Sequence, residues 1–190
     1  MPKIRSFLAI ELPPTIAQGI ERVQGDLIQS HADVRWVEPS RIHLTLKFFG
    51  DIDKEACDEI IDAVGKAVSG VKPFSLTVKG LGAFPSIKNP RVIWLGIEDD
   101  GEVLKSLQRA VEEDLRRIGY PGEERKFKPH LTLGRVRSGR GKSGLLVRME
   151  DLFHVDLGEF RVDRLVLFKS DLRPTGPIYS ELRDFKLGGG

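Results

Sequence analysis

Two copies of the tetrapeptide His-Leu-Thr-Leu, at residues 43–46 and 130–133, are the segments of this chain best suited to chemistry. Alternation within each copy predicts a half-buried strand, with His and Thr on one face and both leucines on the other. A single copy is typical of a strand with a polar outer face. Two copies are harder to explain in that way, because β propensity does not require histidine at the same place twice. We therefore take His43 and His130 as the candidate catalytic pair.

Two histidines that flank one small site can divide the work of acid and base. An imidazole has an unperturbed pKa of about 6.5, so near neutrality it can be either a neutral base or a charged acid. One ring can take a proton from the nucleophile while the other gives one to the leaving group, and each transfer contributes roughly 10²–10⁴-fold. Displacement at a phosphodiester needs both transfers, because an alkoxide leaves. The hydroxyls of Thr45 and Thr132 can then hydrogen-bond the non-bridging phosphate oxygens.

Basic residues gather around the second copy, with Phe127 among them. This composition resembles a surface for a phosphate backbone with one stacked base, although a merely solubilising face explains each single residue equally well. On the first strand, alternation places Lys47 on the face of His43 and Thr45, so we expect it to point toward the site. The basic residues are Arg125, Lys126, Lys128, Arg135, Arg137, Arg140 and Lys142.

A metal site is the competing interpretation of the two histidines. Catalytic zinc usually takes three protein ligands, and neither copy has a further histidine or carboxylate at ligand spacing. The remaining histidines, His31 and His154, are expected on the surface. We therefore expect neither a metal nor a cofactor.

The segment 139–144 resembles a phosphate-binding loop because it contains Gly141-Lys142-Ser143. The Walker pattern requires a glycine five positions before Gly141, where Val136 stands. No clear apolar helix is expected after this segment either. We interpret it as a solvated basic loop and reject ATP hydrolysis or ATP-driven ligation through it.

The elements around the two tetrapeptides recur at a constant spacing. The histidines are 87 positions apart (130 − 43), and the same offset carries residues 7–11 onto 94–98 and Pro14 onto Gly101. A strand, a helix and a His-x-Thr strand thus recur in one order, which indicates an internal duplication. Duplicated halves that pack about a pseudo-twofold axis would set the two His/Thr faces against each other across a cleft.

The remaining pattern predicts an α+β chain of helices and short strands. Helices are expected over about 14–27, 56–67 and 103–118. Strands are expected over about 7–10, 35–37, 43–50, 74–79, 92–95, 130–133, 165–168 and 178–185. Loops are expected over 82–90 and 139–144, and residues 188–190 are expected to form a flexible glycine tail.

Composition limits the class of protein without identifying it. The 190 residues are 40% hydrophobic and 31% charged, as in a globular protein, and a net charge of +2 does not by itself predict a nucleic-acid binder. The single Cys57 excludes an internal disulfide and a thiolate metal site, and it fits a reducing compartment. The apolar run near the N-terminus is too short for a signal peptide or a membrane span. We expect a cytoplasmic protein with no membrane partner.

These residues resemble the 2H phosphoesterase superfamily. Within it the chain is most similar to the RNA 2′,3′-cyclic phosphodiesterases, historically called 2′-5′ RNA ligases. The similarity runs from about Arg5 to Leu182. It is carried by both His-x-Thr-x motifs and by the segments 5–10, 90–95, 127–135, 167–170 and 176–179.

The resemblance implies a single bilobal domain over residues 1–187, with two mainly antiparallel sheets facing a central cleft and helices outside. It implies opening of an RNA 2′,3′-cyclic phosphate to a 2′-phosphate, with His43 as proton donor to the leaving 3′ oxygen and His130 as base on water. Thr45 and Thr132 would hold phosphate oxygens. Arg135 would contact the substrate, although alternation places it opposite His130, so this role requires a twist or a bulge.

The resemblance also implies a metal-independent reaction without a cofactor, and a monomer that acts on RNA ends such as those of tRNA fragments. A 5′-hydroxyl in place of water would join RNA ends through a 2′-5′ bond without ATP. Two alternatives stay open at this point. One is action on another cyclic phosphate or a small nucleotide, and the other is a non-catalytic module that binds RNA or nucleotides.

Overall fold

A computed structural model describes residues 3–123, 126–174 and 176–188. The strands are β1 (Ile4–Ile10), β2 (Val34–Trp36), β3 (Leu44–Ile52), β4 (Phe74–Ser86), β5 (Asn89–Glu98), β6 (His130–Val136), β7 (Asp156–Val162), β8 (Arg164–Asp171) and β9 (Ile178–Lys186). The helices are α1 (Pro14–Ile28), α2 (Lys54–Val68), α3 (Val103–Arg117) and α4 (Lys142–Asp151), with a 3-10 turn, η1 (Pro39–Arg41), before β3.

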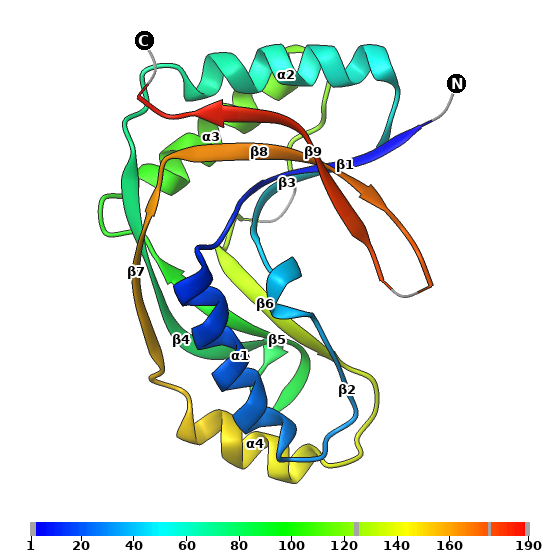
Figure 1. Ribbon diagram of the computed structural model, residues 1–190, viewed down its shortest axis with the longest axis vertical. Coiled ribbons are helices and arrows are strands. Elements are labelled where there is room, and N and C mark those ends of the chain that lie inside the picture. The colour runs from blue at the N-terminus through cyan, green and yellow to red at the C-terminus, as the bar shows by residue number, and fades with distance from the viewer. Residues whose placement is uncertain (1–2, 124–125, 175, 189–190) are drawn as a thin grey trace.

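The strands form two antiparallel sheets. The first sheet has the order β3-β1-β8-β9 and the second has the order β2-β6-β5-β4-β7. Figure 1 shows the first sheet with α2 and α3 at the top of the molecule, and the second sheet with α1 and α4 below. The expected α+β fold with two antiparallel sheets and outer helices is therefore confirmed.

Helices α1 and α3 each follow a strand of one sheet and pack on the side of the other. Helix α1 follows β1 of the first sheet, yet it packs against β7 and α4, and a Cβ on Gly19 would lie 3.1 Å from Leu157 of β7. Helix α3 follows β5 of the second sheet, yet it packs against α2. The buried positions of α1 follow helical spacing at Ile16, Ile20, Val23 and Leu27. This exchange joins both sheets to one hydrophobic cluster.

Two expected loops are wrong. Strand β4 continues to Ser86 and pairs with β5 up to Asn89, so the predicted loop over 82–90 is a hairpin. Gly82, the first residue of that predicted loop, lies within the strand, where a Cβ would overlap the Trp94 ring of the neighbouring strand. Helix α4 begins at Lys142, inside the predicted loop over 139–144, and buries Leu145 and Met149.

Strand β7 lacked a clear alternating signal and was not expected, but it pairs with β4 as an edge strand. In the predicted tail, the Gly188 amide donates to the Val71 carbonyl at 2.7 Å, and residues 189–190 lie outside the described residues. No helix in the described part of the chain is both long and apolar enough to cross a membrane.

Candidate active site

Both histidines line one cleft of about 530 Å³ between the two sheets. His43 and Thr45 come from the start of β3 in the first sheet, and His130 and Thr132 come from β6 in the second. The leucines between them are fully buried, so the alternation predicted from the sequence holds within each tetrapeptide. The other lining residues are Arg35, Trp36, Val37, Glu38, Arg41, Ile42, Arg135, Gly176, Pro177 and Tyr179.

The two rings are held in the same way. The Nδ1 atom of His43 lies 2.9 Å from the Arg41 carbonyl oxygen, and Nδ1 of His130 lies 2.7 Å from the Lys128 carbonyl oxygen. A carbonyl can only accept, so we assign the ring hydrogen to Nδ1 in both cases. Each neutral ring therefore has an unprotonated Nε2 available for proton transfer. The two carbonyls are also 87 positions apart (128 − 41), the same offset as the histidines.

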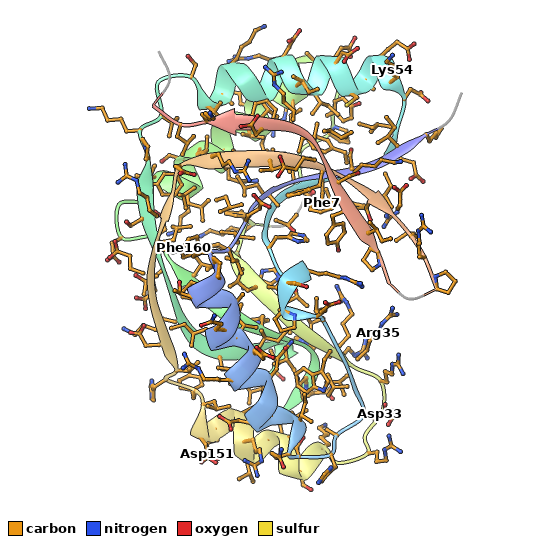
Figure 2. All side chains as sticks on the ribbon, in the orientation of Figure 1. Phe7, Asp33, Arg35, Lys54, Asp151 and Phe160 are labelled. Atoms are coloured by element: carbon orange, nitrogen blue, oxygen red, sulfur yellow. The ribbon has the colours of Figure 1, made fainter. Side chains whose placement is uncertain are left out.

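The surroundings of the two rings differ. His43 stacks on Phe7, with ring centroids 4.5 Å apart, and meets the edge of Tyr179 at 5.2 Å. Figure 2 shows Phe7 between the two layers of the molecule, close to β9. His130 instead has Phe84 edge-on at 5.1 Å and Trp94 at 6.4 Å. Burial of His43 beside Phe7 and Tyr179 lowers its pKa to about 4, and the hydrogen bond to the Arg41 carbonyl only partly opposes this effect. The ring is thus neutral at neutral pH.

An anion in the cleft is expected to raise the pKa of His43, because a negative charge within about 4–6 Å favours imidazolium. In an NMR titration, the His43 ring of the free protein should titrate near pH 4. With saturating inorganic phosphate, its midpoint should move up by at least about one pH unit. His43→Asn assigns the resonance. A midpoint near the ordinary value of 6.5 in the free protein would contradict the effect of burial.

The same shift makes folding stability depend on pH. The pKa of His43 in the folded state, about 4, is below its ordinary value of 6.5, so the unfolded chain takes up this proton first. The contribution of His43 to the free energy of unfolding is therefore fully present above pH 6.5. It declines as the pH falls from 6.5 to about 4 and is constant below that.

A β-bulge in each motif strand reverses the alternation after the tetrapeptide. On β3, Thr45 pairs with Ala9 and Lys47 with Leu8, which leaves Leu46 as an extra residue. On β6, the strand neighbours of Thr132 and Gly134 are likewise adjacent, which leaves Leu133 extra. The two bulges are 87 positions apart (133 − 46). Beyond them, a residue that simple alternation puts on one face lies on the other.

The bulges change the positions of two predicted site residues in opposite directions. Arg135 is exposed and lines the cleft with His130, as its suggested role requires. The expectation that Lys47 points into the cleft is wrong. Its side chain is only 5% exposed, and its Nζ lies 3.0 Å from Glu112 Oε1 of α3, on the helix side of β3.

The predicted base-stacking residue also lies elsewhere. Phe127 is partly buried against the hydrophobic cluster that α3 and the sheets share, and it is not among the residues that line the cleft, so the structure does not place it to stack a base there. Of the basic residues near the second motif, Arg135 lines the cleft, whereas Lys142 donates to Asn89 and Arg140 lies 3.9 Å from Asp33. Arg125 lies outside the described residues.

The structure adds cleft residues that were not identified from the sequence. Arg35, on the short edge strand β2, is the neighbour of Arg135. Arg41 precedes the first motif and pairs with Glu38 at 3.1 Å. Tyr179 was noted only as part of the family resemblance. The β8–β9 hairpin passes close to Arg41 at Gly176, where φ is +115° and a Cβ would contact Nη1 of that arginine. Nothing local marks these residues, because the cleft brings together distant parts of the chain.

Other predicted features lie away from the cleft. His31 and His154 are exposed, as expected. The described residues contain no group of three or more His, Cys, Asp or Glu side chains able to hold a metal ion. Since a helix does follow the Walker-like segment, the case against a phosphate loop now depends on Val136 alone.

Comparison with known proteins agrees with this geometry. The sequence model of the LigT-like phosphoesterase family matches the chain twice, over residues 10–94 and 95–179. The two matches begin 85 positions apart (95 − 10), close to the offset of the motifs. The chain therefore belongs to the LigT-like phosphoesterase family, and by class it is a phosphoesterase.

Individual relatives match nearly the whole chain. The RNA 2′,3′-cyclic phosphodiesterase of Methanothermobacter thermautotrophicus is 37% identical over 185 residues, which cover 97% of this chain and all of the relative. The crystal structure of TT0787 of Thermus thermophilus has a TM-score of 0.77 and 29% identity, with 98% and 99% of the two chains covered. Apo LigT of Escherichia coli has a TM-score of 0.78 and 25% identity, with the same coverage.

Proposed function

We propose that this protein opens RNA 2′,3′-cyclic phosphate ends to 2′-phosphates by metal-independent catalysis with two histidines. One observation carries the proposal: two imidazoles from opposite sheets line one cleft, and each is held through Nδ1 by a carbonyl two residues earlier, which leaves Nε2 as the nitrogen free for proton transfer. The names of the relatives support RNA with a cyclic phosphate end as the substrate class. We further propose a cytoplasmic, monomeric protein with a single bilobal domain over residues 1–187.

In the proposed reaction, His130 Nε2 takes a proton from water as the water oxygen attacks phosphorus. His43 Nε2–H gives a proton to the 3′ oxygen as its bond to phosphorus breaks, which leaves the phosphate on the 2′ oxygen. Thr45, Thr132 and Arg135 hold the non-bridging oxygens as negative charge develops on them. Since free His43 is neutral near pH 7, it acquires its proton together with the anionic substrate.

The same site supports ligation without ATP. If a 5′-hydroxyl takes the place of water, His130 deprotonates it and the leaving 3′ oxygen again takes a proton from His43. The product is a 2′-5′ phosphodiester. ATP is unnecessary because one phosphodiester bond of the cyclic phosphate breaks as the new one forms. An RNA with a free 5′-hydroxyl added to the assay should therefore compete with water for the cyclic end.

The test is hydrolysis of a short RNA with a 2′,3′-cyclic phosphate end, with excess chelator present. We expect full activity with the chelator and a product that carries a 2′-phosphate, identified against 2′- and 3′-phosphate standards. A 3′-phosphate product would mean that the 2′ oxygen, and not the 3′ oxygen, is the leaving group. Loss of activity with chelator would contradict the metal-free mechanism.

A panel of other ligands separates the two alternatives. Faster turnover of a different cyclic phosphate, such as a 3′,5′-cyclic nucleotide, would favour action on a small nucleotide. Tight binding of the cyclic-phosphate RNA with no product after long incubation would favour a binding module.

A further inference from the structure

The cleft contains more positive charge than one cyclic phosphate needs. A 2′,3′-cyclic phosphodiester carries a single negative charge. Arg35, Arg41 and Arg135 all line the cleft, and among its described lining residues Glu38 is the one carboxylate. That carboxylate lies 3.1 Å from Nε of Arg41, which leaves Arg35 and Arg135 facing the substrate space. The charge therefore suits a ligand with more than one phosphate.

Arg35 and Arg135 are direct cross-strand neighbours. The antiparallel pairing of β2 with β6 sets these two residues opposite each other, and both side chains are exposed. Like charges directly opposite in an antiparallel pair destabilise the sheet. Neither arginine has an ion pair within the described ranges of the chain. An anionic ligand that lies across both strands would turn this repulsion into binding energy.

A buried side chain on α1, that of Gln24, holds the two strands of this pair in register. Nε2 of Gln24, on α1, donates to the carbonyl of Leu133 at 2.9 Å and to that of Val37 at 2.7 Å. Leu133 is the bulge residue that turns Arg135 toward the cleft, and Val37 directly follows β2. One amide thus fixes both strands at the point where they present the two arginines.

The placement of the pair allows contact with two successive phosphates. Neighbouring strands lie about 4.8 Å apart, so the two arginine side chains start from separate strands and can reach different phosphates of one ligand. Arg135 is on the strand of His130 and Thr132, so it is the nearer of the two arginines to the reacting phosphate. Arg35 is one strand further out, and Figure 2 shows it at the outer edge of the second sheet.

We propose that Arg35 binds the phosphodiester that joins the terminal nucleotide to its 5′ neighbour. The protein then prefers cyclic-phosphate ends of at least two nucleotides over cyclic mononucleotides. This inference rests on the proposed function and adds a subsite to it. Arg35 is a specificity residue in this scheme, because it contacts a phosphate that does not react.

The test compares two substrates that differ by one phosphodiester: adenosine 2′,3′-cyclic phosphate, and the dinucleotide ApA with a 2′,3′-cyclic phosphate end. In Arg35→Gln, kcat/KM for the dinucleotide should fall by about 10-fold or more, the factor expected for one charged hydrogen bond. The value for the mononucleotide should stay within about twofold of the wild type, because that substrate lacks the phosphate contacted. The salt dependence of dinucleotide KM should weaken by about one phosphate contact.

The matched control is Arg161→Gln, an exposed arginine on β7 at the opposite edge of the same sheet. It should leave both substrates unaffected. Equal losses on both substrates for Arg35→Gln would place Arg35 at the terminal phosphate and overturn the inference, as would the absence of loss on either. A wild-type protein that turns over neither substrate would contradict the proposed function itself. Arg35→Gln also removes a like-charge pair, so its thermal stability should equal or exceed that of the wild type.

Discussion

Replacing His43 or His130 with alanine is expected to lower kcat for the cyclic-phosphate RNA by at least about 100-fold in each case. Each substitution removes one proposed proton transfer, while the threonines and Arg135 that line the cleft stay in place. The double variant should lose less than the product of the two single factors, because the two transfers act in one step. His31→Ala and His154→Ala are the controls, since both of those rings are exposed. Full activity in both single variants would remove the pair from the catalytic centre.

A substrate with an activated leaving group can separate the two roles. In a 3′-deoxynucleoside 2′-(4-nitrophenyl phosphate), the leaving nitrophenolate needs no proton. If His43 is the acid, His43→Ala should lose much less activity on this substrate than on the cyclic phosphate, while His130→Ala should lose about as much on both. The opposite pattern would exchange the roles. Since His43→Ala also removes a ring that stacks on Phe7, thermal unfolding of each variant should accompany the kinetics.

The candidate catalytic pair could be identified from the sequence because each half is a repeated local pattern. The alternation in each tetrapeptide requires only two residues of context, and the common offset of 87 supplied the symmetry that places both copies at one cleft. The same kind of local signal predicted α1, α2 and α3, whose apolar residues follow helical spacing. It was weaker for β7, whose exposed residues outnumber its buried ones.

The errors begin where one extra residue reverses the alternation. Lys47 was expected in the cleft because it lies two residues after Thr45, and the bulge at Leu46 moves it to the helix side. The equivalent bulge at Leu133 brings Arg135 to the cleft. A bulge is stabilised by tertiary contacts, here the Gln24 amide on the Leu133 carbonyl, and α1 supplies that amide from 109 positions away. A window of a few residues contains no information about such a partner.

The cleft residue Arg35 was missed for a related reason. Its strand β2 has three residues, and it exists because it pairs with β6, whose Arg135 lies 100 positions later in the chain (135 − 35). The loop predicted over 82–90 was wrong for a similar reason, because Gly82 accommodates the Trp94 ring of the neighbouring strand within the continuous strand β4. In both cases the determinant is a neighbouring strand that is distant in sequence.

Lys47, which was predicted to lie in the cleft, instead forms a buried ion pair with Glu112, and we expect this pair to contribute strongly to the free energy of unfolding. Lys47 Nζ lies 3.0 Å from Glu112 Oε1 and donates to the Pro121 carbonyl at 3.1 Å, and the two charged side chains are only 5% and 11% exposed. It joins β3, which carries the first motif, to α3 and to the segment that leads into the second motif. Removing one charge leaves the other buried without its partner, which typically costs about 3–5 kcal/mol.

Urea unfolding of Lys47→Met should therefore show a free energy of unfolding lower by about 3–5 kcal/mol, and the double variant Lys47→Met/Glu112→Leu should recover most of that loss. Lys105→Met breaks a pair of the same 3.0 Å length, between Lys105 and Glu102, in which both side chains are largely exposed. That control should change stability far less than Lys47→Met does, because solvent screens an exposed pair. At a temperature where Lys47→Met is fully folded, its kcat should stay near the wild-type value, because Lys47 lies on the helix side of β3. A variant that is as stable as the wild type but fails to turn over the cyclic-phosphate RNA would instead return Lys47 to the substrate site.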